Sequence, residues 1–178
     1  MDTIAERLVI CGVDEVSKYR YHHITHMLSV TNPKTKSVRP KWFTGEHLEL
    51  YFGDVISASD AAQCKTIAPS IDDVARAVNF MSSAWSVSGS KVLIQCDYGA
   101  SRSPALAYVA FTNEMGVGSE EKAFQAVLDI QPSAVPNMLV VQLGDEFLKR
   151  NGALLIPLYE HYKQITKEFT LGWKKMDV

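Results

Sequence analysis

The chain has 178 residues, of which 47% are hydrophobic and 21% are charged, and its formal net charge is −2. This length can bury one sizeable core, so a single domain over residues 1–178 is expected. The near-neutral charge excludes the strongly basic character of many proteins that bind nucleic acid or anionic membranes. No apolar run approaches the length of a membrane span. The first residues lack the cationic start and long apolar region of a signal peptide, so we expect a cytoplasmic protein.

Three cysteines are present, and they can neither all pair with one another nor match the spacing of metal ligands: Cys11, Cys64 and Cys96. Free thiols in a reducing compartment are the simplest interpretation. A regulatory disulfide between Cys96 and one of the other two is left open. No metal site is predicted, because the neighbouring histidines lack an acidic or cysteine partner and strand alternation would divide them between two faces: His22, His23 and His26.

The first half of the chain alternates short apolar runs with turn residues. In chain order, the patterns predict a strand over 8–13, a helix over 14–21, a strand over 23–30, an exposed loop over 34–41 and a strand over 48–52. The connection from there to Pro69 has turn residues and no clear periodicity.

The second half is mainly helical around one short strand. A capping box at Ser70 and an apolar face predict a helix that ends before Gly89. The remaining elements are a strand over 91–95 and helices over 102–115, 119–130, 137–150 and 154–171. Strands that alternate with helices indicate an α/β domain with a mainly parallel central sheet flanked by helices and a helical C-terminal part. We expect its core to span about 8–152.

The segment between the strand over 91–95 and the helix over 102–115 carries the main functional signal. Its sequence is CDYGASRSP, in which five residues separate Cys96 from Arg102. A strand–loop–helix turn directs backbone N–H groups and the positive end of a helix at one point, which suits a phosphate. Small residues let the backbone approach the anion, and an arginine can bind two phosphate oxygens. The predicted phosphate-binding residues are Asp97, Tyr98, Gly99, Ala100, Ser101 and Arg102.

Cys96 is the predicted nucleophile of this segment. The helix N-terminus and the guanidinium of Arg102 favour its thiolate form, and a thiolate beside bound phosphate can attack phosphorus. Ser103 is expected to hydrogen-bond the sulfur and help it leave in a second step. Ser103 and Pro104 also suit the N-cap and the first position of the helix. The alternative is an inert buried cysteine at a strand end.

These residues resemble the protein tyrosine and dual-specificity phosphatases, a superfamily of cysteine-dependent enzymes. The match is Cys96-x5-Arg102-Ser103 with Gly99 in place, and it is most similar to a bacterial branch of small tyrosine phosphatases. The segments HLELYFGDV (47–55) and PSAVPNMLVVQL (132–143) look like the family's acid-bearing strand and its Pro-Asn helix. The resemblance implies a dual-specificity-phosphatase-like fold, a phosphocysteine intermediate hydrolysed by water, and no metal or organic cofactor.

The resemblance places Asp54 as the general acid that protonates the leaving oxygen. A carboxyl at a strand end, followed by a loop able to close over the substrate, also suits this role. Two alternatives stay open: Asp54 forms a turn after Gly53, or Asp60 is the acid, because the connection is longer than in compact enzymes. Asn137 matches the family's Pro-Asn position, and we favour its interpretation as a residue that caps a helix.

The expected function is hydrolysis of phosphotyrosine in a protein or peptide, with phosphoserine and phosphothreonine as weaker substrates. The alternative is a phosphate-binding module without turnover, because Gln95 stands where the family usually has His and Asp97 places an acid beside the nucleophile. No basic residue lies within the loop over 97–101, which disfavours lipid or polyphosphate substrates. The oligomeric state is not predicted.

The loop over 34–41 allows two interpretations. Its four basic residues could attract an acidic phosphopeptide, although a solvated loop needs no such role and we favour that simpler interpretation: Lys34, Lys36, Arg39 and Lys41. Trp42 and Phe43 beside them could line a pocket for an aromatic ester or anchor the loop by hydrophobic packing.

Overall fold

The computed structural model describes residues 3–35 and 39–176, with side chains described through residue 168. In this part of the chain, four parallel strands form one sheet in the order β1-β4-β2-β3. Their bounds are Leu8–Gly12 for β1, His26–Thr31 for β2, Glu46–Tyr51 for β3 and Val92–Cys96 for β4. The mainly parallel α/β sheet predicted from the sequence is confirmed.

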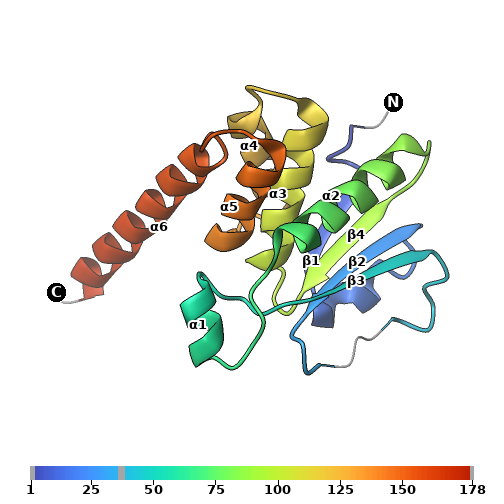
Figure 1. The fold of residues 1–178 in the computed structure, drawn as a ribbon, viewed down its shortest axis with the longest axis horizontal. Helices are drawn as coiled ribbons and strands as arrows, with labels where there is room; N and C mark the ends of the chain where they lie inside the picture. Colours follow the sequence, from blue (N-terminus) through green and yellow to red (C-terminus); the bar gives the residue numbers. More distant parts are fainter. Residues whose placement is uncertain (1–2, 36–38, 177–178) are drawn as a thin grey trace.

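Helices cover both faces of this sheet unequally (Figure 1). Their bounds are Val13–Tyr19 for the 3-10 helix η1, Ala58–Gln63 for α1, Ile71–Ser86 for α2, Arg102–Met115 for α3, Glu120–Ile130 for α4, Met138–Leu148 for α5 and Leu155–Met176 for α6. The bundle of α2 to α5 packs on one face, η1 lies on the other, and α6 extends away from the bundle (Figure 1). Within the described residues, no helix is both long and apolar enough to cross a membrane.

The structure differs from the sequence-based expectations in three local elements. The helix predicted over 14–21 is a 3-10 helix, and β2 begins at His26 rather than at 23. His23 has a φ of 56°, which a strand does not allow, so His22 and His23 lie in the connection before β2. The connection without periodicity contains α1, which is too short for an apolar repeat but begins at a Ser57 cap that accepts from the Asp60 N–H.

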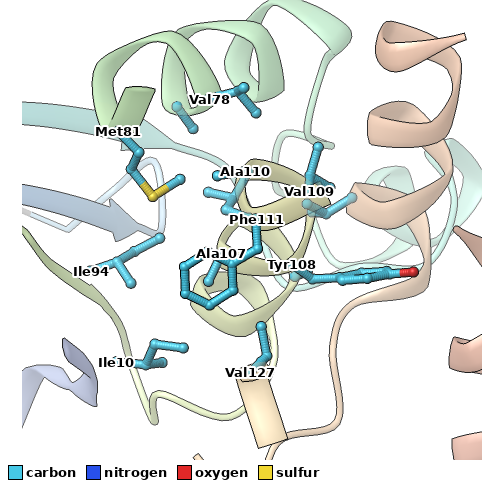
Figure 2. Packing of buried hydrophobic residues seen from close by; sticks show 14 of the residues in the cluster. Ile10, Val78, Met81, Ile94, Ala107, Tyr108, Val109, Ala110, Phe111 and Val127 are labelled. Atoms are coloured by element: carbon cyan, nitrogen blue, oxygen red, sulfur yellow. The ribbon is translucent and has the colours of Figure 1, made fainter. Parts of the chain in front are cut away.

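The main core lies between the sheet and α3 (Figure 2). Residues 102–112 of α3 are buried all around, because the sheet, α2, α4 and α5 each pack against one of its sides. Phe111 stacks on Trp85 of α2 with ring centroids 5.5 Å apart. Tyr108 packs edge-on against Phe124 at 5.0 Å and donates its hydroxyl to the Leu154 carbonyl, and its burial raises the pKa of this phenol. This rigid helix supports the loop at its N-terminus.

A second, smaller cluster covers the opposite face of the sheet. It contains five buried residues: Cys11, Val16, Met27, Phe43 and Leu93. Trp42 packs against the same cluster, so Trp42 and Phe43 anchor the loop that precedes β3 and do not line an ester pocket. Burial raises the pKa of the Cys11 thiol to about 12, which keeps it protonated and unreactive at neutral pH.

Arg7 ties the start of β1 to the end of α2. Its Nε donates to the Ser90 carbonyl at 2.9 Å, Nη1 to the Trp85 carbonyl at 3.0 Å and Nη2 to the Val87 carbonyl at 2.6 Å. A cation that binds the last carbonyls of a helix satisfies groups without an intrahelical partner and opposes the helix dipole. Arg7 therefore closes the α2–β4 connection.

The change Arg7→Met is expected to lower the free energy of unfolding by about 2–4 kcal/mol, because several charge-assisted hydrogen bonds are lost together. Urea denaturation followed by circular dichroism measures this change. Arg76→Met is the matched control, since Arg76 is exposed on α2 and has no polar partner among the described residues. Its effect is expected within about 0.5 kcal/mol of zero, and an equal loss in both variants would contradict the assignment.

Candidate active site

The carboxyl ends of the parallel strands bring the predicted site residues to one edge of the sheet. Cys96 ends β4, Asn32 follows β2, and Asp54 follows β3 after two intervening residues. Because β4 lies between β1 and β2, the loop over 97–101 emerges at the centre of this edge. Open parallel sheets commonly bind ligands here.

The loop over 97–101 is folded tightly against the end of β1. Gly99 has a φ of +70°, and a Cβ atom there would lie 2.4 Å from the carbonyl carbon of Cys11 and 2.6 Å from the Gly12 nitrogen. The Val13 N–H also donates to the Asp97 carbonyl at 3.2 Å. Only glycine satisfies both the left-handed backbone and the close approach. The backbone of this loop is therefore fixed before any ligand arrives.

The Cys96 sulfur is buried at the end of β4, outside the lining of the pocket described below, and is contacted by Ser103. Cys96 is 2% exposed, and the Ser103 hydroxyl donates to its Sγ at 3.2 Å. The expected N-cap at Ser103 is wrong: α3 begins at Arg102, its N-cap is Ser101, and Ser103 turns its hydroxyl toward the sulfur instead. Pro104 still lies in the first turn, where the missing N–H is tolerated.

Arg102 is buried beside the loop, and most of its donors are engaged. It is 2% exposed; Nη1 donates to the Phe52 carbonyl at 3.0 Å, and Nη2 lies 2.8 Å from the Asp97 carboxylate. Its Nε is buried without a hydrogen-bond partner among the described residues, and the Asp54 carboxylate is 3.9 Å away. The guanidinium is thus held in place, and its Nε is left without a hydrogen-bond partner among the described residues.

Asn32 and Asp97 complete the support of this guanidinium. The Asn32 side chain donates to the same Asp97 oxygen at 2.9 Å, and its own oxygen lies 3.4 Å from Arg102 Nη1. The Asp97 carboxylate pairs with the arginine, and the predicted contact of the Asp97 backbone with phosphate stays a prediction. The sequence patterns assigned Asn32 no role at the site, although its position after a parallel strand could have indicated one.

Asp54 is held from two directions. Its Oδ1 accepts hydrogen bonds from the Ser101 hydroxyl and from the Asn137 amide, each at 2.7 Å. Asn137 also caps α5 by accepting from the Val140 N–H at 3.0 Å, so the favoured capping role is confirmed and a contact with Asp54 is added. Asp54 remains 40% exposed. Its carboxyl is therefore oriented yet accessible from the solvent.

Asp60, the competing acid, lies elsewhere. Its Oδ2 accepts from the Ile56 N–H at 3.1 Å, and its Oδ1 lies 3.7 Å from Cys64 Sγ. Both oxygens serve the α1 turn, and the residue does not line the pocket above Arg102. Of the two candidate acids, Asp54 therefore lines the pocket and Asp60 does not.

Residues 134–137 form a connection between the site and α6. The Val135 N–H donates to the Ala100 carbonyl at 2.7 Å, which attaches this segment to the loop over 97–101. From α6, Tyr162 Oη donates to the Pro136 carbonyl at 2.6 Å and His161 Nε2 donates to the Ala134 carbonyl at 2.9 Å. Burial and then the charge of Asp54 raise the pKa of Tyr162. The sequence assigned α6 no role at the site.

A pocket of about 420 Å³ opens above Arg102. Its lining comes from the site and from two flanking segments: Asn32, Pro33, Lys34, Gly53, Asp54, Val55, Cys64, Lys65, Thr66, Asp97, Tyr98 and Arg102. A larger hollow of about 830 Å³ lies along α6 but contains none of the loop residues, so the smaller pocket is the one that matters for chemistry. In the described part of the chain, no group of three His, Cys, Asp or Glu could hold a metal ion.

Gln95 is buried on the other face of the sheet from the sulfur. It is 3% exposed and its Oε1 has no hydrogen-bond partner among the described residues. An unpaired buried acceptor costs stability, so the residue next to the nucleophile is not optimised for packing.

Comparison with known proteins identifies the fold. No protein-family model and no curated protein sequence matches the chain. Human DUSP28 aligns at 17% identity over 86% of this chain and 99% of its own, with a TM-score of 0.64. Tk-PTP in its active form aligns at 16% identity over 83% and 95%, with a TM-score of 0.60. A human tyrosine phosphatase-like serine/threonine/tyrosine-interacting protein aligns at 19% identity over 82% and 93%, with a TM-score of 0.61. The predicted dual-specificity-phosphatase-like fold is confirmed.

Proposed function

We propose that this chain, which has the fold of the dual-specificity phosphatases, hydrolyses phosphotyrosine in proteins through a phosphocysteine intermediate. Phosphoserine and phosphothreonine are weaker substrates in this proposal. The observation that carries it is one strand–loop–helix segment that holds Cys96 Sγ 3.2 Å from the Ser103 hydroxyl and buries an Arg102 Nε without a hydrogen-bond partner among the described residues. These are a nucleophile, a group that stabilises it and a free donor for phosphate oxygens.

In the first step, the Cys96 thiolate attacks phosphorus in line with the ester oxygen. The S–P bond forms as the P–O bond to the tyrosine breaks, and Asp54 gives its proton to the departing oxygen. The amides of the loop over 97–101 and Arg102 Nε stabilise the negative charge on the other phosphate oxygens. Asp54 suits this step because its carboxyl is held by two hydrogen bonds beside the pocket.

In the second step, water attacks the phosphocysteine. Asp54, now ionised, accepts a proton from the water as the new P–O bond forms and the S–P bond breaks. Ser103 donates to the departing sulfur, which stabilises the thiolate that leaves. Phosphate then dissociates, and the Asp97 carboxylate remains on Arg102 Nη2 throughout.

The substrate preference is argued from the pocket mouth. Tyr98 is 87% exposed and lines the pocket, so its ring is available to pack against the ring of a phosphotyrosine. A phosphoserine side chain is shorter and offers no ring to this surface. The proposal therefore ranks phosphotyrosyl above phosphoseryl peptides.

A kinetic panel under reducing conditions tests the proposal. We expect measurable turnover of a phosphotyrosyl peptide, slower turnover of the matched phosphoseryl peptide, and the slowest turnover of a phosphoinositide. Release of inorganic phosphate is the readout. If no phosphoester is hydrolysed while phosphotyrosyl peptide still binds, the protein is a binding module instead.

That second candidate rests on two observations. Asp97 occupies one of the two Arg102 nitrogens suited to phosphate, and Gln95 is buried with an unpaired oxygen where the family usually has His. Both features weaken activation of the sulfur. The contacts of Asp54 with Ser101 and of Ser103 with Cys96 favour an enzyme over a binding module. Binding alone needs neither an acid nor a group that stabilises the departing sulfur.

Tyr162→Phe is expected to lower kcat for poor leaving groups about 3- to 10-fold and to change hydrolysis of activated aryl phosphates little. Loss of the hydrogen bond to Pro136 loosens the segment over 134–137, which carries Asn137 and so orients the carboxyl of Asp54. Tyr162 is a positioning residue in this account. A series of aryl phosphates with leaving groups of different basicity measures the effect. Tyr159→Phe on the exposed side of α6 is the control, and an equal loss on all substrates would contradict a role through Asp54.

A further inference from the structure

Two lysines stand at the mouth of the pocket above Arg102. Lys34 comes from the connection between β2 and β3, and Lys65 follows α1. Both line the pocket and both are exposed. Neither has an acidic partner in the part of the chain that the structure describes. Two free cations from separate segments thus flank the proposed phosphate site.

The position of Lys65 is fixed by the backbone around it. Its φ of 51° lies in the left-handed region, which a residue with a side chain adopts only when its surroundings impose it. The next residue, Thr66, packs so closely on Gly53 that a Cβ atom at Gly53 would lie 2.5 Å from its side chain. The Gly53 N–H also donates to the Ile67 carbonyl at 2.8 Å. Lys65 is therefore held beside the strand end that carries Asp54.

Lys34 is attached to the site through Asn32. The Thr35 N–H donates to the Asn32 carbonyl at 2.9 Å, which closes a turn around Lys34, while the Asn32 side chain contacts Asp97 and Arg102. The other basic residues of the loop over 34–41 differ. Arg39 donates to the Phe43 and Gly45 carbonyls, Lys41 does not line the pocket, and Lys36 lies outside the described residues.

Within the described chain, the two acids inside the pocket, Asp54 and Asp97, form no ion pair with the two lysines at its mouth. Asp97 is paired with Arg102 Nη2, and Asp54 accepts from Ser101 and Asn137 and lies 3.9 Å from Arg102 Nε. In the proposed mechanism, the bound phosphate is held by the amides of the loop over 97–101 and by Arg102 Nε. Lys34 and Lys65 are exposed cations on the lining of the same pocket, so they are available to side chains next to the phosphorylated residue.

We propose that Lys34 and Lys65 form a subsite for acidic side chains that flank the phosphotyrosine, so that the preferred substrate is an acidic phosphotyrosyl segment. The inference rests on the proposed function and adds the sequence context of the substrate. Lipid headgroups with further phosphates are disfavoured, because the loop over 97–101 has no cation and carries Asp97 at its start. The lysines act on the flanks and take no part in the chemical steps.

The test compares three phosphotyrosyl peptides that are identical except for acidic, neutral or basic flanking residues. Each kcat/KM is divided by that of the same variant for para-nitrophenyl phosphate, which has no flanks. At low salt, the wild-type protein is expected to prefer the acidic over the neutral peptide about 10-fold, because each of two exposed ion pairs contributes a few-fold gain in affinity. Most of this preference is expected to disappear at high salt. The variant K34E/K65E is expected to prefer the basic peptide. The control Lys41→Glu changes an exposed lysine outside the pocket and is expected to keep the wild-type order.

Three outcomes separate this inference from the proposed function. Turnover of all three peptides at equal relative rates, or an unchanged order in K34E/K65E, would overturn the subsite and leave the phosphatase proposal intact. The subsite would also be overturned if a phosphoinositide is hydrolysed faster than the acidic peptide and loses this advantage in K34E/K65E. That result would assign the lysines to lipid phosphates. If no phosphoester is turned over, fluorescence anisotropy of the labelled peptides on Cys96→Ser decides the same question by affinity: tighter binding of the acidic peptide supports the subsite, and equal binding overturns it.

Discussion

Replacement of Cys96 by serine is expected to lower phosphotyrosine hydrolysis by about 10⁴-fold or more while peptide affinity stays within about threefold. A serine hydroxyl is a poor nucleophile without a general base, and no histidine lines the pocket among the residues that the structure describes. The loop over 97–101 and Arg102 bind phosphate without the sulfur, so affinity survives. Initial rates under reducing agent and isothermal titration calorimetry measure the two quantities.

Cys64→Ser is the control for this prediction, because Cys64 is the exposed thiol at the pocket mouth. Its activity is expected within about twofold of the wild type, since the described contacts of its sulfur are confined to Asp60. Residual turnover in Cys96→Ser that exceeds a few per cent, or a collapse in Cys64→Ser, would assign the nucleophile elsewhere.

Asp54→Asn is expected to lower kcat for phosphotyrosyl and phosphoseryl peptides by about 10²–10³-fold, as loss of a general acid does. The amide keeps the shape and a hydrogen-bond acceptor for Ser101, so the pocket is preserved. The loss should be smaller for aryl phosphates whose leaving groups need no proton. Steady-state kinetics across leaving groups measures this difference.

The matched variant Asp60→Asn decides between the two carboxyls. Asp60 accepts from the Ile56 N–H at the start of α1, so its replacement is expected to lower stability by about 1 kcal/mol and to leave kcat nearly unchanged. A larger loss of kcat in Asp60→Asn than in Asp54→Asn would reverse the assignment of the acid.

The sequence predicted the parts of the site that depend on local order. Cys96, Gly99, Arg102 and Ser103 lie within one short segment, and a strand–loop–helix turn fixes how such residues face one another. The parallel sheet followed from alternation of strands and helices. The helix over 102–115 was predicted correctly, but its N-cap was assigned to Ser103 rather than Ser101, because local helix signals do not account for a hydroxyl that turns toward a sulfur.

The residues that the sequence did not assign to the site reach it through tertiary contacts. Asn32 contacts Arg102 from 70 positions away, and the Phe52 carbonyl does so from 50. Tyr162 contacts the Pro136 carbonyl, in a segment for which the sequence predicted only the start of a helix. Periodicity and turn patterns contain no information on which distant groups meet, so these contacts need the fold.

Quantitative mass spectrometry of the Cys96 peptide after rapid acid quench tests the central claim most directly. During turnover of a phosphotyrosyl peptide by the wild-type protein, the account predicts a phosphate group covalently bound to Cys96 that forms before steady state and is absent from Cys96→Ser. Steady hydrolysis with an unmodified Cys96 at every time point would contradict it.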